Sequence, residues 1–428
     1  MKFHIGNALL LGALAFPICG APKKSQSKAP SGGVIVFQRS KKLEAVNLVS
    51  GKTSVLRDSF LYDERYKSWG GDWQMSPDGR RIAFAATPRD LGVLNDAATQ
   101  ALYLFTASFK SKQRVFLGSY RLSRFSNSYG INFADISWSA DGRRLVVSEQ
   151  GDGYGGGPSD VALRDLRSRR EVWSSLPISR HFLEVGAKKF NYPFNTRYEY
   201  GGPGFLNLRS LFAPALSPDG KDLICLAALK SFGVHGYDFM EGDKALQTFL
   251  VHFDVKHKTG EVVALIDDGF SVDRYRVEGH ATISVGKKQP FKPQFIWHPT
   301  QRKVVFVGPA SPTDPTRNLF AFDLQTKKMS RLTNSAQDDF SPQWSLDGKQ
   351  LYWIRGNGNS INPYAFRLKP EATSPASNRI LRANADGSNP TAILPQIQGV
   401  TRIQLLPKIA DWSRYRKLSI EPLAGKDK

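Results

Sequence analysis

The chain has 428 residues, enough for one large or two medium domains, and a hydrophobic content of 41% allows a sizeable core. With 37 Gly, 25 Pro and few helical stripes, the composition argues against a helical chain and indicates a turn-rich, all-β one. The formal net charge of +21 predicts a preference for anionic surfaces such as lipid headgroups, acidic polysaccharide or cell-wall polymer. The alternative is that this charge serves solubility alone.

Residues 1–20 are typical of a secretory signal peptide. Their apolar core, Ala8–Phe16, is too short to cross a bilayer as a helix, and cleavage is expected after Gly20. Two alternatives stay open: acylation of Cys19, to which the three residues before it are poorly suited, and an uncleaved anchor. Export predicts a periplasmic or secreted protein, and it argues against nucleic acid as the partner of the basic charge.

A basic linker follows the signal, and the ordered chain follows the linker. Residues 21–33 are rich in Pro, Ser, Gly and Lys without apolar periodicity, which is typical of a flexible linker. Short apolar runs separated by turn residues begin at Val34. Once Cys19 has left with the signal, Cys225 is the only Cys, so no intrachain disulfide is expected. The apolar run around Cys225 predicts an inert core residue.

A phrase built on a Ser-x-Asp-Gly turn recurs along the chain. In most copies a Trp stands before the turn, and an apolar strand follows it. The Asp side chain can accept backbone N–H bonds across the turn, Gly can take the positive φ of a tight hairpin, and the Trp is expected to fill the space between neighbouring repeats. The copies are Trp73–Phe84, Ser137–Val147, Ala215–Cys225, Ser341–Arg355 and a degenerate Ile296–Phe306, where Thr-Gln replaces Asp-Gly.

Each repeat predicts four antiparallel strands. Around the last copy, Asp339–Trp344 and Gln350–Ile354 are the first two strands. A third strand with alternating large apolar residues and a brief fourth strand are clearest just upstream, at Asn318–Leu324 and Met329–Thr333. Four antiparallel strands repeated radially make a β-propeller blade. Five copies therefore predict five blades.

A sixth blade is expected to be shared between the two ends of the chain. Val34–Phe37, Leu43–Leu48 and Thr53–Leu56 supply three strands without an innermost partner, and Val400–Leu405 is a lone strand after the last copy. Joining them removes free strand edges. The predicted fold is an all-β, six-bladed β-propeller of four-stranded antiparallel blades, closed by the N- and C-terminal strands in one blade. The predicted domains are a signal peptide at 1–20, a linker at 21–33, the propeller at 34–405 and a C-terminal tail at 406–428.

Strand direction predicts that the two faces of the propeller differ. Turns joining strands one and two, or three and four, lie on one face, here called the short-turn face; they are short and basic, and Arg80, Arg143 and Lys41-Lys42 are assigned to them. These turns are either simply solvated or dock on an anionic envelope. The other connections lie on the opposite face, here called the insertion face, where long loops on a rigid scaffold usually carry binding. The largest insertions are Leu176–Arg209, Ala228–Ala245, Asp267–Lys292 and Gly356–Asn378.

Two stretches of the insertion face, Phe190–Tyr200 and Asp273–Arg276, interleave aromatic residues with Arg. Such surfaces suit sugar rings or a peptide anchor, and packing of a long loop on the scaffold is the alternative. His235 and His280 also lie in insertions of this face, where each can reach a ligand or simply pack. The candidate ligand-binding residues are Arg197, Tyr198, Tyr200, His235, Tyr237, Arg274, Tyr275 and Arg276.

The sequence predicts no catalytic residue, metal or cofactor. The His residues form no pair with metal-ligand spacing, and neither a GxSxG elbow nor a P-loop occurs. Gly151–Gly157 resembles a phosphate-binding loop only in its glycines, and His298, which stands where other repeats have Ser, is expected to be a turn residue. The enzymatic alternative, a polysaccharide lyase or hydrolase, needs two carboxylates that converge at the channel mouth. The candidates are Asp63, Glu64, Asp96, Asp238, Glu241, Asp267 and Asp268.

The phrase Trp-Ser-Leu-Asp-Gly-Lys-Gln-Leu-Tyr-Trp, following Asn-Leu-Phe-Ala-Phe-Asp-Leu and Ser-Arg-Leu-Thr, resembles the repeat of the TolB-type β-propellers. The resemblance covers Val34 to about Leu405 and implies a periplasmic protein; TolB itself works with a peptidoglycan-associated lipoprotein in envelope integrity. Here a short linker stands where TolB has an α/β domain, and the insertions exceed the compact family repeat. Both departures argue against a role in the Tol complex.

The leading hypothesis is an exported, non-catalytic, monomeric propeller. It is expected to bind a protein or an anionic envelope polymer through the insertion face. Peripheral contact with an anionic membrane surface is also expected from its basic charge.

Overall fold

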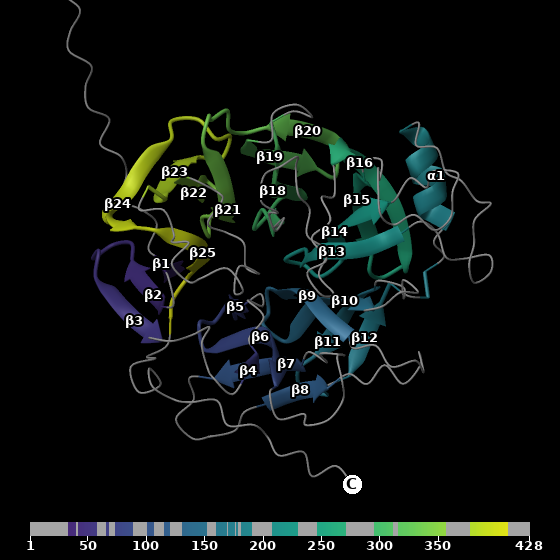
Figure 1. The fold of residues 1–428 in the computed structure, drawn as a ribbon, viewed down its shortest axis with the longest axis horizontal. Helices are drawn as coiled ribbons and strands as arrows, with labels where there is room; N and C mark the ends of the chain where they lie inside the picture. The colour runs from purple at the N-terminus through teal and green to yellow at the C-terminus, as the bar shows by residue number, and fades with distance from the viewer. Residues whose placement is uncertain are drawn as a thin grey trace, which may run out of the picture.

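The computed structural model has its sheets arranged radially around a common centre (Figure 1). It describes residues 33–39, 42–57, 66–67, 73–88, 101–106, 115–119, 131–151, 160–168, 170–175, 177–178, 181–190, 208–229, 246–270, 295–310, 316–356 and 377–409. The predicted signal peptide, most of the linker and most of the C-terminal tail lie outside these residues, so the predicted domain organisation stays a prediction.

Five of the sheets are blades of four antiparallel strands. The closing blade contains β25 (Val400–Leu406), β1 (Val34–Arg39), β2 (Lys42–Asn47) and β3 (Thr53–Arg57). The β9–β12 blade contains β9 (Ile131–Trp138), β10 (Arg144–Gly151), β11 (Asp160–Asp165) and β12 (Glu171–Ser174). The β13–β16 blade contains β13 (Leu208–Leu216), β14 (Asp222–Leu229), β15 (Leu246–Asp254) and β16 (Thr259–Phe270). The β17–β20 blade contains β17 (Ile296–Trp297), β18 (Lys303–Pro309), β19 (Arg317–Asp323) and β20 (Lys328–Arg331). The β21–β24 blade contains β21 (Asp338–Trp344), β22 (Gln350–Gly356), β23 (Arg379–Asn384) and β24 (Thr391–Gln398).

The remaining sheet departs from this pattern, and the prediction of six four-stranded blades was therefore wrong. It has five strands, namely β4 (Tyr66–Lys67), β5 (Trp73–Met75), β6 (Arg81–Pro88), β7 (Ala101–Thr106) and β8 (Val115–Ser119). Both β4 and β5 pair with the same edge of β6, through Tyr66↔Pro88 and Trp73↔Phe84. The physical reason is length, because β5 covers only three of the eight residues of β6 and leaves the rest of that edge to β4.

The two ends of the described chain meet in the closing blade. β25 pairs antiparallel with β1, from Leu406↔Val34 to Val400↔Arg39, and so supplies the innermost strand that β1–β3 lack. This pairing covers an edge of β1 that would otherwise be open to other chains.

The four Asp-Gly turns share one hydrogen-bond arrangement, which confirms the predicted role of the Asp. In the last copy the Ser345 hydroxyl donates to Asp347 (2.6 Å), and Asp347 accepts the N–H of Lys349 (3.1 Å). The same Ser345 oxygen accepts the N–H of Gln350 (2.9 Å), which closes the hairpin. Gly348 takes φ +70°, in the left-handed region that favours glycine. The turns of Asp78, Asp141 and Asp219 have the same bonds.

Trp residues of the repeat join neighbouring sheets, as predicted. The indole N–H of Trp138 donates to the carbonyl of Gln74 (2.9 Å), and that of Trp297 donates to the carbonyl of Ala215 (2.9 Å). In both cases the acceptor belongs to the first strand of the preceding sheet. An Arg of the preceding sheet also covers the ring of Trp138, since the Arg81 guanidinium lies 5.0 Å from it.

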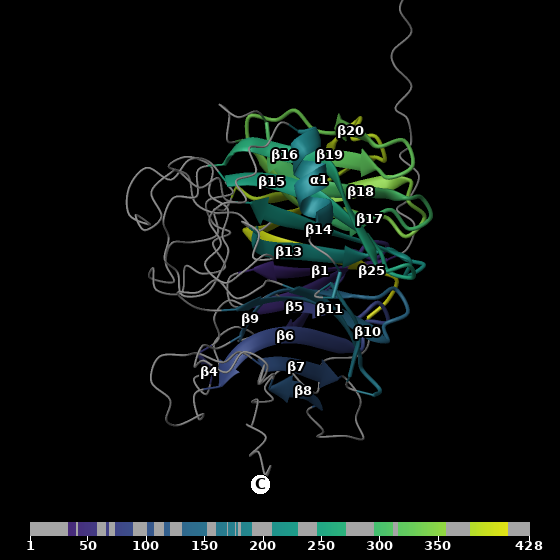
Figure 2. The same ribbon diagram turned by 90° about the vertical axis from the view of Figure 1, so that its right-hand side faces the viewer.

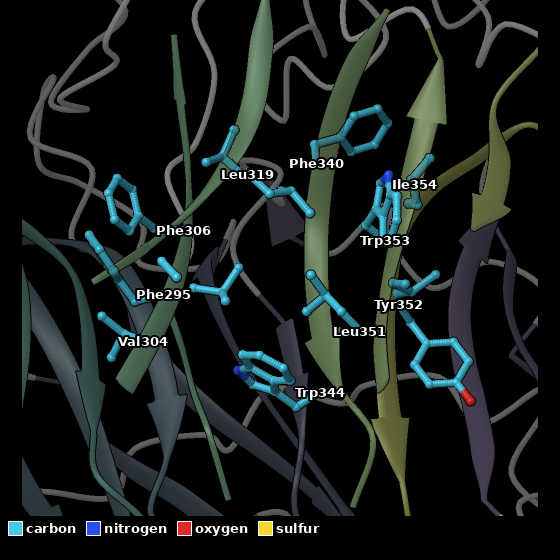
Figure 3. Packing of buried hydrophobic residues seen from close by; sticks show 14 of the residues in the cluster. Phe295, Val304, Phe306, Leu319, Phe340, Trp344, Leu351, Tyr352, Trp353 and Ile354 are labelled. Carbon is cyan, nitrogen blue, oxygen red and sulfur yellow. The ribbon is translucent and has the colours of Figure 1, made fainter. Parts of the chain in front are cut away.

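The largest hydrophobic cluster extends over the closing, β13–β16, β17–β20 and β21–β24 blades. Figure 3 shows some of its members on neighbouring strands, among them Phe306 on β18, Phe340 on β21 and Trp353 on β22. Phe306 and Trp353 are almost completely buried. Burial of each such side chain contributes about 1.5–3 kcal/mol, so this continuous core holds the blades together as one unit.

One helix, α1 (His181–Lys189), lies in the described part of the chain and packs on the outermost strand β16. Gly186 faces Val262 so closely that a Cβ at Gly186 would lie 2.4 Å from the Cβ of Val262. The Phe182 ring meets the edge of Phe253 at a centroid distance of 5.5 Å. Within the described residues, the chain has no helix whose length and apolar character would suffice for crossing a membrane.

Candidate functional site

The strand order places both ends of the longest intervals between described strands at the insertion face. The side view of Figure 2 shows the strands running between this face and the short-turn face. Intervals between second and third strands, and intervals between blades, both start and end at the insertion face because neighbouring strands are antiparallel. These intervals are 89–100, 175–207, 230–245, 271–295 and 357–378.

The assignment of Lys41-Lys42 to the short-turn face was wrong. β25 is the innermost strand of the closing blade, so β1 is its second strand and β2 its third. The hairpin that pairs Arg39 with Lys42 therefore lies at the insertion face. The assignment did not follow from the predicted shared blade, in which Val400–Leu405 is already the innermost strand and the strand at Val34 the second.

The candidate ligand-binding residues lie outside the described residues; they are Arg197, Tyr198, Tyr200, His235, Tyr237, Arg274, Tyr275 and Arg276. The same holds for His280 and for five of the candidate carboxylates, namely Asp63, Glu64, Asp96, Asp238 and Glu241. Asp267 and Asp268 lie on β16. The predicted grouping of these residues therefore stays a prediction.

A buried ionic cluster stands at the insertion-face end of β21 and β22. Asp339 is fully buried and accepts two hydrogen bonds from Arg355, at 2.7 Å from Nε and 2.9 Å from Nη2. It also accepts the indole N–H of Trp353 (2.9 Å). Next to it, Asp338 accepts the backbone N–H of Arg317, a residue whose burial lowers its pKa to about 10. The cluster ties the start of β21 to the end of β22, where the interval 357–378 begins.

A second cluster joins two blades at the short-turn face. His252 on β15 lies between two carboxylates, with Nε2 at 2.8 Å from Asp222 and Nδ1 at 3.0 Å from Glu261. From the β17–β20 blade, Arg302 donates to both oxygens of Asp222 (3.1 and 2.7 Å), and Lys327 pairs with Glu261. The hydrogen bond from His252, followed by that from Lys327, lowers the pKa of Glu261 to about 2 although burial opposes the shift.

His298 is a turn residue, as predicted, and it also joins two blades. Its Nδ1 accepts the N–H groups of Thr300 (3.2 Å) and Gln301 (3.1 Å), which replaces the Ser and Asp of the other turns. Its Nε2 donates to the carbonyl of Gly348 in the next blade (3.1 Å), and its ring lies edge-on to Trp344 at 4.8 Å. Burial lowers the pKa of His298 from its ordinary value.

Sequence reasoning missed the interactions of His252 and Asp339, although a weak signal existed for Asp339. The first-strand Asp338-Asp339 and the second-strand Arg355 bracket one hairpin, and antiparallel register places them opposite each other. For His252 the same kind of signal existed, because Glu261 lies opposite it in the next hairpin, but Arg302 and Lys327 come from the next blade and have no local signal. In the part of the chain that the structure describes, no group of three His, Cys, Asp or Glu residues could hold a metal ion.

The short-turn face carries mixed charge. The Ser345 hydroxyl and the N–H of Lys349 hold the pKa of Asp347 below its usual range. The pKa values of Asp78, Asp141 and Asp219 are also lowered, although burial opposes the shift. Each of these ionised Asp residues therefore offsets a neighbouring Arg or Lys in its own turn.

Similarity to known proteins was found among solved structures, whereas no family model and no curated protein matches the chain. TolB from Acinetobacter baumannii is 13% identical, with a TM-score of 0.47, over 89% of this chain and 68% of that one. An oligogalacturonate lyase from Vibrio parahaemolyticus is 12% identical, with a TM-score of 0.43, over 85% and 73%. A protein assigned as TolB from Agrobacterium tumefaciens is 14% identical, with a TM-score of 0.41, over 84% and 87%.

Similarity at this level carries no argument about function. The assignment of the fold depends instead on the chain's own blade topology and on its Ser-x-Asp-Gly repeat. The chain is a β-propeller. Within this β-propeller the charged clusters described above serve the scaffold, because each joins strands or neighbouring blades.

Proposed function

We propose that the chain is an exported, non-catalytic β-propeller that binds a protein or an anionic polymer of the cell envelope through its insertion face. The observation that carries the proposal is the strand order, which attaches the longest intervals to one face and the Asp-Gly turns to the other. Binding residues are commonly found on long loops that a rigid scaffold positions.

The scaffold has the rigidity that such a function requires. Its hairpins are tied by Ser-Asp turns, its sheets are joined by buried Trp residues, and its ends are paired in one blade. A preorganised scaffold loses little conformational entropy when its loops bind a partner. The net charge of +21 favours an anionic partner, and the signal-like residues 1–20 support export.

The test compares two variants that alter one face each. In the insertion-face variant, residues 230–246 are replaced by Asn-Gly between the register partners Leu229 and Gln247, which suits a two-residue hairpin turn. In the short-turn variant, Arg80, Arg143 and Lys349, exposed residues that follow Asp-Gly turns, become Ser. Binding is measured by capture from an envelope extract and by co-sedimentation with purified envelope polymer, with thermal unfolding as the control for folding.

We expect the insertion-face variant to lose binding and the short-turn variant to keep it. The double change Tyr198→Ala and Tyr200→Ala should reduce capture, whereas His235→Ala or His280→Ala should remove no enzymatic activity. Undiminished binding by both the insertion-face variant and the Tyr198/Tyr200 double variant would refute the proposal. Release of sugar fragments from the polymer would instead favour the polysaccharide lyase or hydrolase.

A further inference from the structure

At the short-turn face, one buried His stands at each junction between the β17–β20 blade and its neighbours. His252 stands at the junction with the β13–β16 blade, and His298 stands at the junction with the β21–β24 blade. Both are at least nine-tenths buried, at 8% and 5% exposure. The hydrogen-bond partners of the two rings require opposite protonation states.

His252 is placed to be an imidazolium. Both of its ring nitrogens face carboxylate oxygens, of Asp222 on β14 and Glu261 on β16. A neutral ring can donate through one nitrogen only, and its other lone pair would then face an anion, whereas the charged ring donates through both. On its own strand, Asp254 pairs with His257 rather than with His252.

The neighbouring blade completes this junction. Arg302 holds Asp222 and Lys327 holds Glu261, so each carboxylate bridges His252 to a cation of the β17–β20 blade. Loss of the proton from His252 would turn one of its nitrogens into an acceptor facing a carboxylate. One of the two carboxylates would then lose its donor and face a lone pair instead.

His298 is placed to be neutral. Its Nδ1 accepts two backbone N–H groups, which requires a lone pair, and its Nε2 donates to Gly348. Lys303 of its own hairpin opposes a positive charge on the ring. In the facing turn, Asp347 accepts hydrogen bonds from the Ser345 hydroxyl and from the backbone N–H of Lys349. A proton on Nδ1 would meet two N–H donors.

We propose that the β17–β20 blade is a pH-responsive element whose two junctions respond in opposite directions. Acidification adds a proton to Nδ1 of His298 and loosens the junction with the β21–β24 blade. Alkalinisation removes a proton from His252 and loosens the junction with the β13–β16 blade. This inference does not depend on the proposed ligand or on the insertion face.

The signs follow from linkage between proton binding and folding. The pKa of His298 is lowered by burial below the unfolded value near 6.5, so its contribution to stability is present above pH 6.5 and declines below it. The pKa of His252 is raised; burial opposes this, but the bonds to Asp222 and Glu261 outweigh it. Its contribution is therefore present below pH 6.5 and is lost as pH rises through the folded-state pKa.

The chain itself offers a matched control for His298. The triple change His298→Ser, Thr300→Asp and Gln301→Gly gives the β17–β20 blade the Ser-Pro-Asp-Gly turn sequence of the Asp219 copy. This turn has no titrating imidazole and keeps the hairpin. For the other junction, His252→Gln keeps a polar side chain that does not titrate.

Hydrogen exchange of the full chain, corrected for the intrinsic pH dependence of exchange, separates the two junctions. In the wild type, residues 298–304 should lose protection from pH 7 to pH 5, and residues 252–262 should lose it from pH 7 to pH 9. The triple variant should abolish the first loss only, and His252→Gln should abolish the second only.

Imidazole titration by NMR of the wild-type chain keeps the proposal testable if a variant fails to fold. We expect His298 to titrate below 6.5 as a neutral Nε2–H tautomer and His252 to titrate above 6.5. A midpoint of His298 at or above 6.5, a midpoint of His252 at or below 6.5, or parallel responses of the two segments would overturn the proposal.

Discussion

At the residue scale, the glycines of the Asp-Gly turns share a conformation but not an environment. Gly220 (φ +74°) and Gly348 (φ +70°) both lie in the left-handed region. A Cβ on Gly220 would meet nothing within 4 Å, whereas a Cβ on Gly348 would lie 2.4 Å from the His298 ring. The turn chemistry could be predicted from the sequence, but this difference could not, because the neighbour belongs to another blade.

We therefore expect Gly220→Ala to reduce the free energy of unfolding by about 1 kcal/mol, the strain of a left-handed alanine. Gly348→Ala should cost a further ~1–3 kcal/mol, because His298 must move to make room for the methyl group. Urea unfolding of the two variants measures the difference. Equal losses would show that His298 does not pack against the turn.

The buried carboxylate of Asp339 permits a second prediction. Asp339→Ala leaves Arg355 and the indole of Trp353 without their acceptor, so the free energy of unfolding should fall by about 3 kcal/mol. Lys221→Ala removes a partner of Asp219 in an exposed pair and should cost less than about 1 kcal/mol. A loss for Asp339→Ala as small as that for Lys221→Ala would contradict the interpretation.

At the element scale, sequence reasoning identified most strands and missed those set by tertiary pairing. Apolar runs after the Asp-Gly turns predicted strands such as β22 and β14, because burial on both faces needs continuous apolar residues. β4, with two residues, has no such run and exists only because β5 leaves part of β6 uncovered. The helix α1, inside a predicted insertion, is likewise defined by its contact with β16.

The contact of α1 with β16 can be tested at a single position. Gly186→Val places methyl groups where Val262 already lies, so it should destabilise the docking of α1 by about 2 kcal/mol or more. Val185→Ala changes the adjacent, 43% exposed residue and should have an effect below about 0.5 kcal/mol. Protection of the α1 amides in hydrogen exchange is the measurement, and unchanged protection in Gly186→Val would refute the packing.

At the scale of the whole molecule, side chains tie the innermost strands to one another around the centre. Gln404 on β25 accepts the N–H of Met75 (2.8 Å) and donates to its carbonyl (2.7 Å), which joins the closing blade to β5. Ser341 on β21 accepts the N–H of Ile403 (3.0 Å), which joins the β21–β24 blade to β25. The closing strand is therefore held on both sides as well as by its pairing with β1.

Gln404→Ala should leave two backbone groups of Met75 without partners and reduce the free energy of unfolding by about 1–3 kcal/mol. Gln398→Ala, an exposed residue of β24, is the control and should have little effect. Equal unfolding midpoints for the two variants would mean that this bridge does not stabilise the closure.

The sequence allowed the overall architecture to be predicted better than the site. The repeat predicts blades because four of its five copies share the same turn chemistry, and the unpaired terminal strands predict the shared blade. The regular count of six failed at the β4–β8 sheet, where strand length departs from the repeat. The contacts of Arg302 and Lys327 with the His252 cluster depend on which blades become neighbours, and no local pattern records that.

The most direct test of the proposed function is site-specific photo-crosslinking in an envelope extract. A photoreactive residue replaces Lys42, exposed on the insertion face, or Lys349, exposed on the short-turn face. Both positions are surface lysines in hairpins, so neither change should disturb the fold. We expect a crosslinked partner from position 42 and none from position 349. Crosslinking from position 349 alone would contradict binding through the insertion face.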